Sequence, residues 1–259
     1  MILYYAVGGG LGHLTRGLRV IEKLGLTDAI IATASPHAER VCGAVPFIRV
    51  PRDLEHDVDA HRAWVRALGA SRIIADTFPG GIQGELCGLD VPIDWVARLL
   101  RWDAYRAAVP YALPEIQTTY VVEDRQDCLS STAVVQLDLS LPVVPEVEEQ
   151  PYWVIVHSGP EEEVRELVAY ADELRALAEK KPERVIVASH CDLWPAAALF
   201  PAAAKIITAA GFNVMLETEQ WRAKHVVVPF ARRFDDQFAR AARRKRWSSA
   251  NAPGPAAAM

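Results

Sequence analysis

The feature that most constrains the fold of this chain is a regular alternation of short apolar runs with longer amphipathic stretches. The first apolar run, Ile2–Val7, is followed by Leu14–Leu24, where Leu14, Leu18 and Ile21 share one helical face at i, i+4 and i+7. Several later runs are apolar throughout, which is typical of parallel strands that are buried on both faces. This alternation predicts an α/β fold built from parallel βαβ units.

The pattern predicts two successive series of such units. In the first we expect a helix at Leu14–Leu24 and strands at Ile2–Val7, Ala29–Thr33, Phe47–Val50, Ile73–Ala75, Ile93–Val96 and Thr119–Val122. In the second we expect strands at Tyr152–Val156, Val185–Ala188, Lys205–Thr208 and His225–Pro229, with helices at Glu161–Lys180, Asn213–Trp221 and Asp235–Arg246.

The amino-acid composition of the chain changes between the two series. The 259 residues amount to about 1.7 domains at roughly 150 residues each, so length alone leaves one or two domains open. The segment Leu141–Pro151 carries three prolines and three glutamates without a helical period, as an inter-domain linker would. We therefore expect an N-terminal Rossmann-like domain at 1–142, a linker at 143–151, a C-terminal one at 152–247 and a disordered tail at 248–259.

Composition excludes several classes of protein. A formal net charge of −5 argues against a nucleic-acid partner. No apolar run approaches the roughly 18 residues of a membrane span, and no basic region precedes the first apolar run as in a signal peptide. The cysteines lie far apart and form no CxxC pair, so we expect a reduced, cytoplasmic protein with neither a zinc site nor a disulfide framework.

The most distinctive motif is GGGLGH, Gly8–His13, between the first strand and the first helix. Glycines there allow a tight turn and let an anionic ligand approach the helix N-terminus. The motif departs from the dinucleotide fingerprint G-x-G-x-x-G, and the chain has no GxxxxGK[ST] phosphate loop. A tight turn with a capping histidine explains the motif equally well. The candidate ligand-contacting glycines are Gly9, Gly10 and Gly12.

A second motif, ADTFPGG at Ala75–Gly81, also follows a strand. Carboxyl ends of parallel strands meet at one edge of the sheet, so Asp76 and His13 are expected at the same edge. A carboxylate that orients an imidazole is a plausible general-base arrangement. The alternative is that Asp76 only caps the turn before Pro79.

The motif HSGPEEE, His157–Glu163, has the strand, glycine, helix order of a phosphate cradle. Ser158 and Glu161 match an S-x-x-E capping box with Pro160 in the first turn. Three consecutive glutamates would repel a phosphate, so the capping interpretation is favoured.

Two further motifs suit a nucleotide sugar. In TAAGFNVMLE, Gly211 opens a helix on which Asn213 and Glu217 share a face, and a carboxylate there can accept two hydrogen bonds from a ribose diol. In VVVPFARRFDDQ, the Arg232–Arg233 pair precedes Asp236–Gln237, which are either ordinary helix caps or partners for sugar hydroxyls.

The last predicted helix ends in ARRKR, Ala242–Arg246. This charge suits a helix C-terminus, the explanation we favour, and it also offers weak peripheral contact with an anionic membrane.

Together these motifs resemble the GT-B glycosyltransferases, in particular the bacterial branch that contains the lipid II-forming N-acetylglucosaminyltransferase. GGGLGHLTRGL is similar to the N-terminal glycine-rich loop of that branch, and ITAAGFNVMLETEQWRAKHVVVPFARRFDDQFARA to its donor-binding stretch. DTFPGGIQGEL resembles a segment of uncharacterised predicted glycosyltransferases. The resemblance implies two Rossmann-like domains facing each other across a cleft, here in a compact version.

The resemblance also implies roles for individual residues. The donor, expected to be a UDP-sugar, would place its ribose at Glu217, its diphosphate near Gly211, Phe212 and Asn213, and its sugar at Asp236 and Gln237. His13 would be the candidate base, or else a contact of the acceptor or of the diphosphate. The acceptor, which is unknown, would bind the N-terminal domain. Such enzymes usually need no metal or other cofactor, because helix N-termini and basic side chains stabilise the leaving diphosphate.

The chain departs from the family in two ways. It is shorter than a typical member, and HSGPEEE replaces the glycine-rich loop after the first strand of the C-terminal half. Two alternatives therefore stay open: a nucleotide-sugar hydrolase or epimerase of the same fold, and a non-catalytic relative that binds a sugar nucleotide or a partner.

Overall fold

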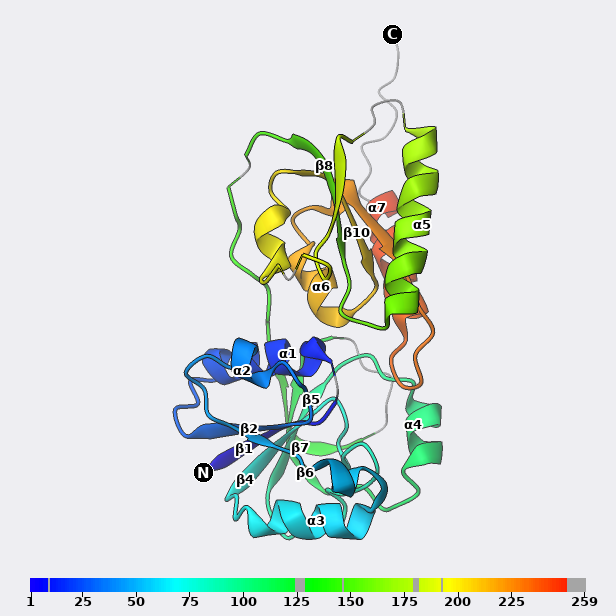
Figure 1. Ribbon diagram of the computed structural model, residues 1–259. Coiled ribbons are helices and arrows are strands. Elements are labelled where there is room, and N and C mark those ends of the chain that lie inside the picture. Colours follow the sequence, from blue (N-terminus) through cyan, green and yellow to red (C-terminus); the bar gives the residue numbers. More distant parts are fainter. Residues whose placement is uncertain (9, 124–128, 146, 179–181, 192, 251–259) are drawn as a thin grey trace. The chain divides into compact units, whose positions relative to one another are not determined.

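The computed structural model describes residues 1–8, 10–123, 129–145, 147–178, 182–191 and 193–250. The chain divides into two compact units, Met1–Ser140 and Leu141–Met259. Each unit is built on its own sheet, and most elements are labelled in Figure 1. Within the described residues, no helix combines the length and apolar character needed to cross a membrane.

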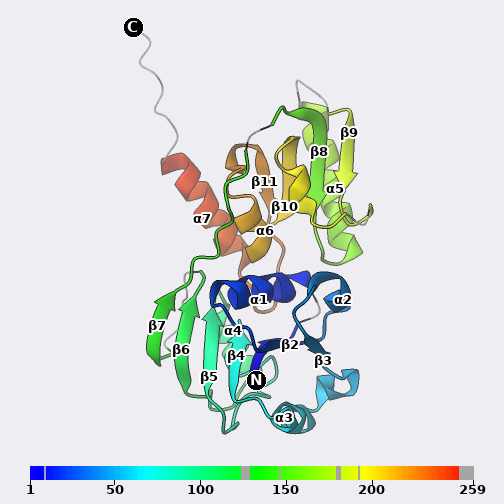
Figure 2. The same cartoon turned by 90° about the vertical axis from the view of Figure 1, so that its left-hand side faces the viewer.

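Unit 1 is a seven-stranded sheet in the order β3-β2-β1-β4-β5-β6-β7, and all neighbouring strands run parallel (Figure 2). This is the Rossmann order, in which the chain reverses its direction of winding between β1 and β4. The strands are β1 (Ile2–Ala6), β2 (Ala29–Thr33), β3 (Phe47–Arg49), β4 (Arg72–Asp76), β5 (Ile93–Ala97), β6 (Ile116–Val121) and β7 (Ser131–Gln136). The helices are α1 (Leu11–Lys23), α2 (Ala38–Val41), η1 (Arg52–His56), α3 (Val58–Ala67) and α4 (Trp102–Ala108).

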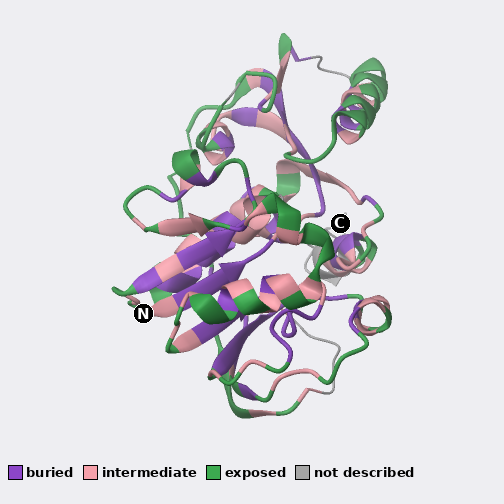
Figure 3. Cartoon of the chain, turned by 60° about the horizontal axis from the view of Figure 1, so that its bottom comes forward, coloured by how far each residue is buried: buried purple, intermediate pink, exposed green. Residues whose placement is uncertain are grey.

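Strand β1 is covered by helices on both faces, because successive side chains of a strand point to opposite sides. Tyr4 faces α1, where a Cβ on Gly17 would lie 2.8 Å from its ring. Tyr5 faces α3 and contacts His61. Helices α1 and α3 accordingly lie on opposite sides of the sheet in Figure 1. The strands between them are buried, whereas the helices expose their outer faces (Figure 3).

Unit 2 is a four-stranded parallel sheet in the order β11-β10-β8-β9. Its chain reverses its direction of winding between β8 and β10, which is where ligands of open α/β sheets bind. The strands are β8 (Gln150–Val156), β9 (Arg184–Val187), β10 (Ala203–Ala209) and β11 (His225–Val228). The helices are α5 (Glu161–Leu177), η2 (Ala196–Leu199), α6 (Phe212–Glu217), η3 (Arg222–Lys224) and α7 (Gln237–Ala250).

Helix α5 packs on one face of this sheet through a narrow apolar stripe. Val164, Leu167 and Ala171 are buried at i, i+3 and i+7. Leu167 and Ala171 join Trp153 and Ile155 of β8 in one core cluster. This packing fixes the first turn of α5 beside the carboxyl end of β8.

Some element boundaries differ from those expected. Helix α1 begins at Leu11, three residues earlier than expected, and α6 already ends at Glu217. Strand β8 begins at Gln150, inside the expected linker. Helix α7 runs to Ala250, so residues 248–250 are helical rather than a disordered tail, and residues 251–259 lie outside the described part.

Sequence analysis missed α3 and β7 for a common reason. Helix α3 buries only His61 and Val65, and Trp64 of the same helix is only partly buried against the core. Five of the six residues of β7 are exposed, so the strand shows neither the alternation of a half-buried strand nor the continuous apolar run of a buried one.

Candidate active site

The main cluster of unit 1 lies at the carboxyl ends of β1 and β4, where the winding reverses. His13 is the third residue of α1, and Asp76 ends β4. The His13 Nδ1 atom lies 2.5 Å from Asp76 Oδ2. At this distance a proton must lie between the two atoms, so His13 donates through Nδ1 and leaves Nε2 as an acceptor. Arg16 Nη2, 3.3 Å from the same Nδ1, is then only a neighbour.

Two further side chains hold the Asp76 carboxylate in place. Tyr4 donates its hydroxyl to Oδ1 at 2.8 Å, and Arg16 donates Nε to Oδ1 at 2.7 Å and Nη2 to Oδ2 at 2.5 Å. Burial alone would raise the pKa of Asp76, but the Arg16 guanidinium and then His13 outweigh it and hold that pKa well below its usual range. The carboxylate therefore stays ionised at neutral pH.

The His13 imidazole is set up as a neutral base. Burial lowers its pKa, the hydrogen bond to Asp76 partly opposes this, and the nearby Arg16 and Arg98 guanidiniums lower it further. Gly8 borders the acceptor edge of the ring, because a Cβ at Gly8 would lie 2.6 Å from Nε2. Only glycine at this position leaves the imidazole where it is.

Thr77 carries backbone strain directly beside this pair. Its φ of 69° is the one left-handed value among the described residues other than glycine, and this conformation is costly for a β-branched side chain. The N–H of Phe78 closes a tight turn onto the Asp76 carbonyl at 2.8 Å. The Thr77 Oγ1 accepts from Arg16 at 2.8 Å and from Arg98 at 3.0 Å. The site thus stores strain where β4 ends.

The glycine-rich loop is shorter than the sequence indicates. Gly10 is the N-cap residue of α1, and the Nδ1 atom of His13 contacts Asp76 rather than the helix end, which disfavours the capping-histidine alternative. Gly12 lies inside the helix, and Gly9 lies outside the described residues. The Asp76 carboxylate accepts hydrogen bonds from the side chains of Tyr4, His13 and Arg16, which disfavours a turn cap.

Sequence analysis also missed partners of this cluster. Arg16, Tyr4 and Thr77 were not singled out, although Arg16 follows His13 by three residues, in the first turn of the expected helix Leu14–Leu24. That spacing was the available signal.

In unit 2, the loop after β8 forms an ionic cluster rather than a cap. Pro160 is the N-cap residue of α5 and offers no side-chain cap, so the predicted capping box of Ser158 and Glu161 is wrong. The Glu163 carboxylate instead contacts His157 Nε2 at 2.6 Å and accepts from both terminal guanidinium nitrogens of Arg232, Nη1 at 2.5 Å and Nη2.

The expected donor-binding residues follow β10. Gly211 is the N-cap residue of the six-residue helix α6, Phe212 is buried in its first turn, and Asn213 follows it. Glu217 is the last residue of α6, one turn beyond Asn213 on the same face.

Asp236 and Gln237 begin α7 and have structural contacts. Asp236 Oδ1 accepts from the N–H of Ala239 at 2.9 Å, as an N-cap does. Gln237 is buried, and its Oε1 accepts from the N–H of Phe230 at 3.0 Å.

The basic run of α7 is partly tied to the same unit. Arg244 donates to the carbonyls of Met215 and Thr218, at the C-terminal end of α6, at 3.1 and 2.8 Å. The expectation that the basic run ends its own helix is wrong, because α7 continues to Ala250 and has no basic residue in its last turn. The side chains of residues 245–250 lie outside the described part of the structure.

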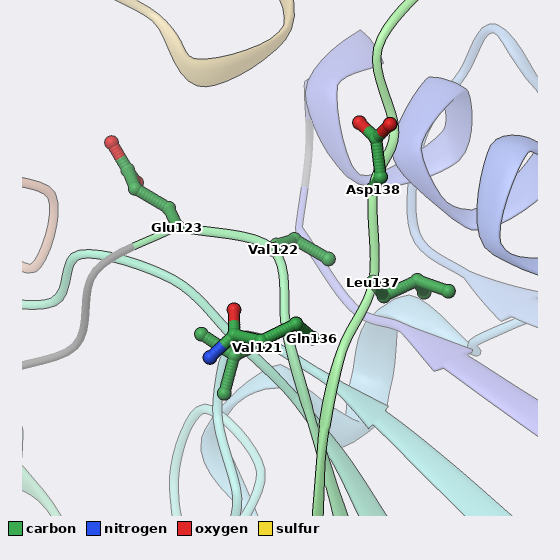
Figure 4. A pocket seen from close by; sticks show the side chains of 6 residues that line it. All are labelled: Val121, Val122, Glu123, Gln136, Leu137 and Asp138. Atoms are coloured by element: carbon green, nitrogen blue, oxygen red, sulfur yellow. The ribbon is translucent and has the colours of Figure 1, made fainter.

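A hollow of about 310 Å³ opens at the carboxyl ends of β6 and β7 in unit 1. Two carboxylates, Glu123 and Asp138, stand on its rim (Figure 4). Glu123 accepts from the N–H of Leu99 at 3.0 Å, and Asp138 from the N–H and hydroxyl of Ser140 at 2.8 and 2.9 Å. The hollow lies at the same edge of the sheet as His13, and sequence analysis missed it because it missed β7.

Comparison with known proteins relates the chain to solved structures alone, since neither a family model nor a curated protein sequence matches it significantly. The glycosyltransferase SsfS6 of Streptomyces sp. SF2575 aligns with a TM-score of 0.57 at 15% identity, over 96% of this chain and 86% of that one. The spinosyn rhamnosyltransferase SpnG, complexed with thymidine diphosphate, aligns with a TM-score of 0.55 at 15% identity, over 96% and 85%.

MurG of Acinetobacter baumannii, from the branch that the sequence resembles, aligns with a TM-score of 0.51 at 16% identity, over 93% of this chain and 82% of that one. The short chain therefore spans most of the length of each neighbour. Its parallel sheets, alternating helices and these neighbours confirm the expected fold class. The chain has the fold of the GT-B glycosyltransferases.

Proposed function

We propose that this protein transfers a sugar from a nucleoside-diphosphate sugar to an acceptor hydroxyl. The observation that carries the proposal is the His13–Asp76 pair at the carboxyl edge of unit 1, where a neutral imidazole is held by a buried carboxylate. The glycosyltransferase fold supports it, as does the thymidine diphosphate bound to the neighbour SpnG.

In the proposed reaction His13 acts as the general base. Its Nε2 takes the proton of the acceptor hydroxyl while the oxygen attacks the anomeric carbon of the donor. The bond between that carbon and the diphosphate oxygen breaks, and the leaving diphosphate keeps the electron pair. Asp76 stabilises the imidazolium that forms, in the way a buried carboxylate supports histidine in a catalytic triad.

We assign donor binding to unit 2. Glu217 is proposed to hold the ribose, and Gly211, Phe212 and Asn213 to approach the diphosphate. Arg232 would supply positive charge to the leaving group in a metal-independent reaction. Asp236 and Gln237 stay candidates for the sugar, although both already make the main-chain contacts described above. A uridine base is our preference.

The hollow between β6 and β7 is our candidate for the acceptor site. Its two rim carboxylates, Glu123 and Asp138, accept hydrogen bonds and so suit an acceptor rich in hydroxyl groups. The proposed location is cytoplasmic, in line with free thiols at the described cysteines Cys42, Cys87 and Cys191.

The test is release of nucleoside diphosphate from UDP-, TDP- and GDP-sugars, with and without hydroxyl-bearing acceptors. Transfer predicts release that requires an acceptor. Release without an acceptor would establish the hydrolase alternative. Donor binding with no turnover would establish the non-catalytic alternative. His13→Ala is expected to keep donor binding and lose release, and unchanged rates in that variant would remove the base role.

A further inference from the structure

The cluster of His157, Glu163 and Arg232 occupies the position in unit 2 where a ligand is expected. His157 follows β8, the strand next to the reversal of winding, and Arg232 follows β11. Glu163, in the first turn of α5, joins them although 69 residues separate it from Arg232. The cluster thus draws on three separate segments of the unit.

The Glu163 carboxylate is held from several sides. Arg232 donates to both of its oxygens, and His157 Nε2 contacts Oε2 at 2.6 Å. Gly159 lets the backbone pass close by, since a Cβ there would lie 2.9 Å from the same Oε2. A guanidinium that donates two hydrogen bonds and an imidazole N–H are also suitable donors to a phosphate group.

The Glu163 side chain is more buried than those of the two glutamates before it. Its side chain is 15% exposed, whereas those of Glu161 and Glu162 are 60% and 71% exposed. Burial alone would raise the pKa of Glu163, but Arg232 and then His157 outweigh it and lower that pKa. The position is therefore occupied by a sheltered anion that the chain itself supplies.

His157 and Arg232 are positioned by a shared aromatic surface. The His157 ring stacks on Phe230 at a centroid distance of 5.5 Å, and the Arg232 guanidinium lies over the same ring at 5.8 Å. The Phe230 ring therefore holds both donor side chains in place independently of Glu163. If the carboxylate rotates away, a second anion finds the donors in place.

We propose that His157 and Arg232 form a diphosphate site and that the Glu163 carboxylate occupies it until a donor displaces it. The identification of the ligand as the donor diphosphate rests on the proposed function. Binding then replaces one anion by another, so Glu163 weakens the retention of diphosphate and favours release of the leaving nucleotide. The glutamate-rich loop is in this view compatible with phosphate binding.

The test is calorimetric titration of the full chain with inorganic pyrophosphate at constant ionic strength. Glu163→Gln removes the competing charge and keeps the shape, so it is expected to tighten the pyrophosphate Kd about tenfold. Glu162→Gln, which removes the same charge from an exposed side chain of the same turn, is expected to change it less than about twofold. Arg232→Gln is expected to weaken it about tenfold.

Two results would overturn the proposal. One is a Glu163→Gln variant that binds pyrophosphate no more tightly than Glu162→Gln does, with thermal unfolding showing all variants folded. The other is binding of UDP or TDP without competition from pyrophosphate, since the site of His157 and Arg232 would then not be the site that binds the donor diphosphate. Competition with nucleotide supports it. If pyrophosphate behaves as expected and no nucleotide binds, the anion site stands and the proposed function fails.

Discussion

His13 Nδ1 and Asp76 Oδ2 lie 2.5 Å apart although 63 positions separate the two residues in the chain. Parallel β1 and β4 are neighbours in the sheet, so the helix after one strand and the last residue of the other meet at one edge. The two residues differ in what they support: Asp76 also holds buried Arg16 and Tyr4, whereas His13 faces the glycine-rich loop.

Replacing Asp76 is therefore expected to affect stability far more than replacing His13. Asp76→Asn leaves the Arg16 guanidinium buried without its counter-charge, which costs about 3–5 kcal/mol. His13→Ala removes one hydrogen bond while Arg16 and Tyr4 remain satisfied, and should cost about 1 kcal/mol. Urea unfolding of both variants measures the difference. Equal losses would show that Arg16 does not depend on Asp76.

The strain at Thr77 can be separated from its hydrogen bonds with two variants. Thr77→Ala removes the Oγ1 acceptor but keeps a Cβ at φ 69°, whereas Thr77→Gly removes both. The glycine variant is expected to be more stable than the alanine variant by about 1 kcal/mol, because only glycine adopts this conformation without strain. An alanine variant as stable as the glycine variant would show that the position is not strained.

Gly8 is expected to control the environment of the His13 ring. A Cβ in Gly8→Ala would displace the imidazole, whereas around Gly10 a Cβ meets nothing within 4 Å. Titration of His13 by NMR should therefore give a changed pKa in Gly8→Ala and the wild-type pKa in Gly10→Ala. The same His13 pKa in both variants would contradict this close approach.

Stability is expected to fall as the pH decreases below about 6.5, the ordinary histidine value. Burial is the first cause that lowers the pKa of four histidines: His13, His61, His157 and His225. Below that pH the unfolded chain binds more protons than the folded chain does, so the free energy of unfolding decreases. Denaturant unfolding measured from about pH 7.5, above the ordinary histidine pKa, down to about pH 4 follows this loss.

His225 provides the control for this pH dependence, because burial and then Arg244 lower its pKa to about 3. Its Nε2 contacts Thr208 Oγ1 at 2.7 Å, a contact that a glutamine amide can retain. His225→Gln should reduce the slope of unfolding free energy against pH by about 1 kcal/mol per pH unit. An unchanged slope would show that His225 is not the responsible group.

Much of the fold follows from apolar periodicity, since the strands on both sides of each reversal of winding are buried and apolar. The carboxyl-edge rule also brings His13 and Asp76 to one edge. Their direct contact was not predictable, because it depends on Tyr4 and Arg16, whose side chains meet Asp76 only after β1 and β4 pair.

The loop after β8 shows where a local pattern misleads. Ser158 and Glu161 match a capping box, but Pro160 occupies the N-cap position, and Glu163 contacts Arg232 from a distant segment. A tertiary ion pair therefore decides the structure of this loop. The ligand roles of Gly211, Asn213, Glu217 and Asp236 stay predictions, because the fold places these residues without showing what they bind.

The central claim, that the chain binds a nucleoside-diphosphate sugar, is tested most directly by calorimetric titration with UDP, TDP, GDP and their sugar conjugates. We expect wild-type protein to bind at least one of them, and Glu217→Ala to abolish binding while its melting temperature stays nearly unchanged. Binding of none of these ligands at concentrations of about 1 mM, equivalent to roughly −4 kcal/mol, would contradict the claim.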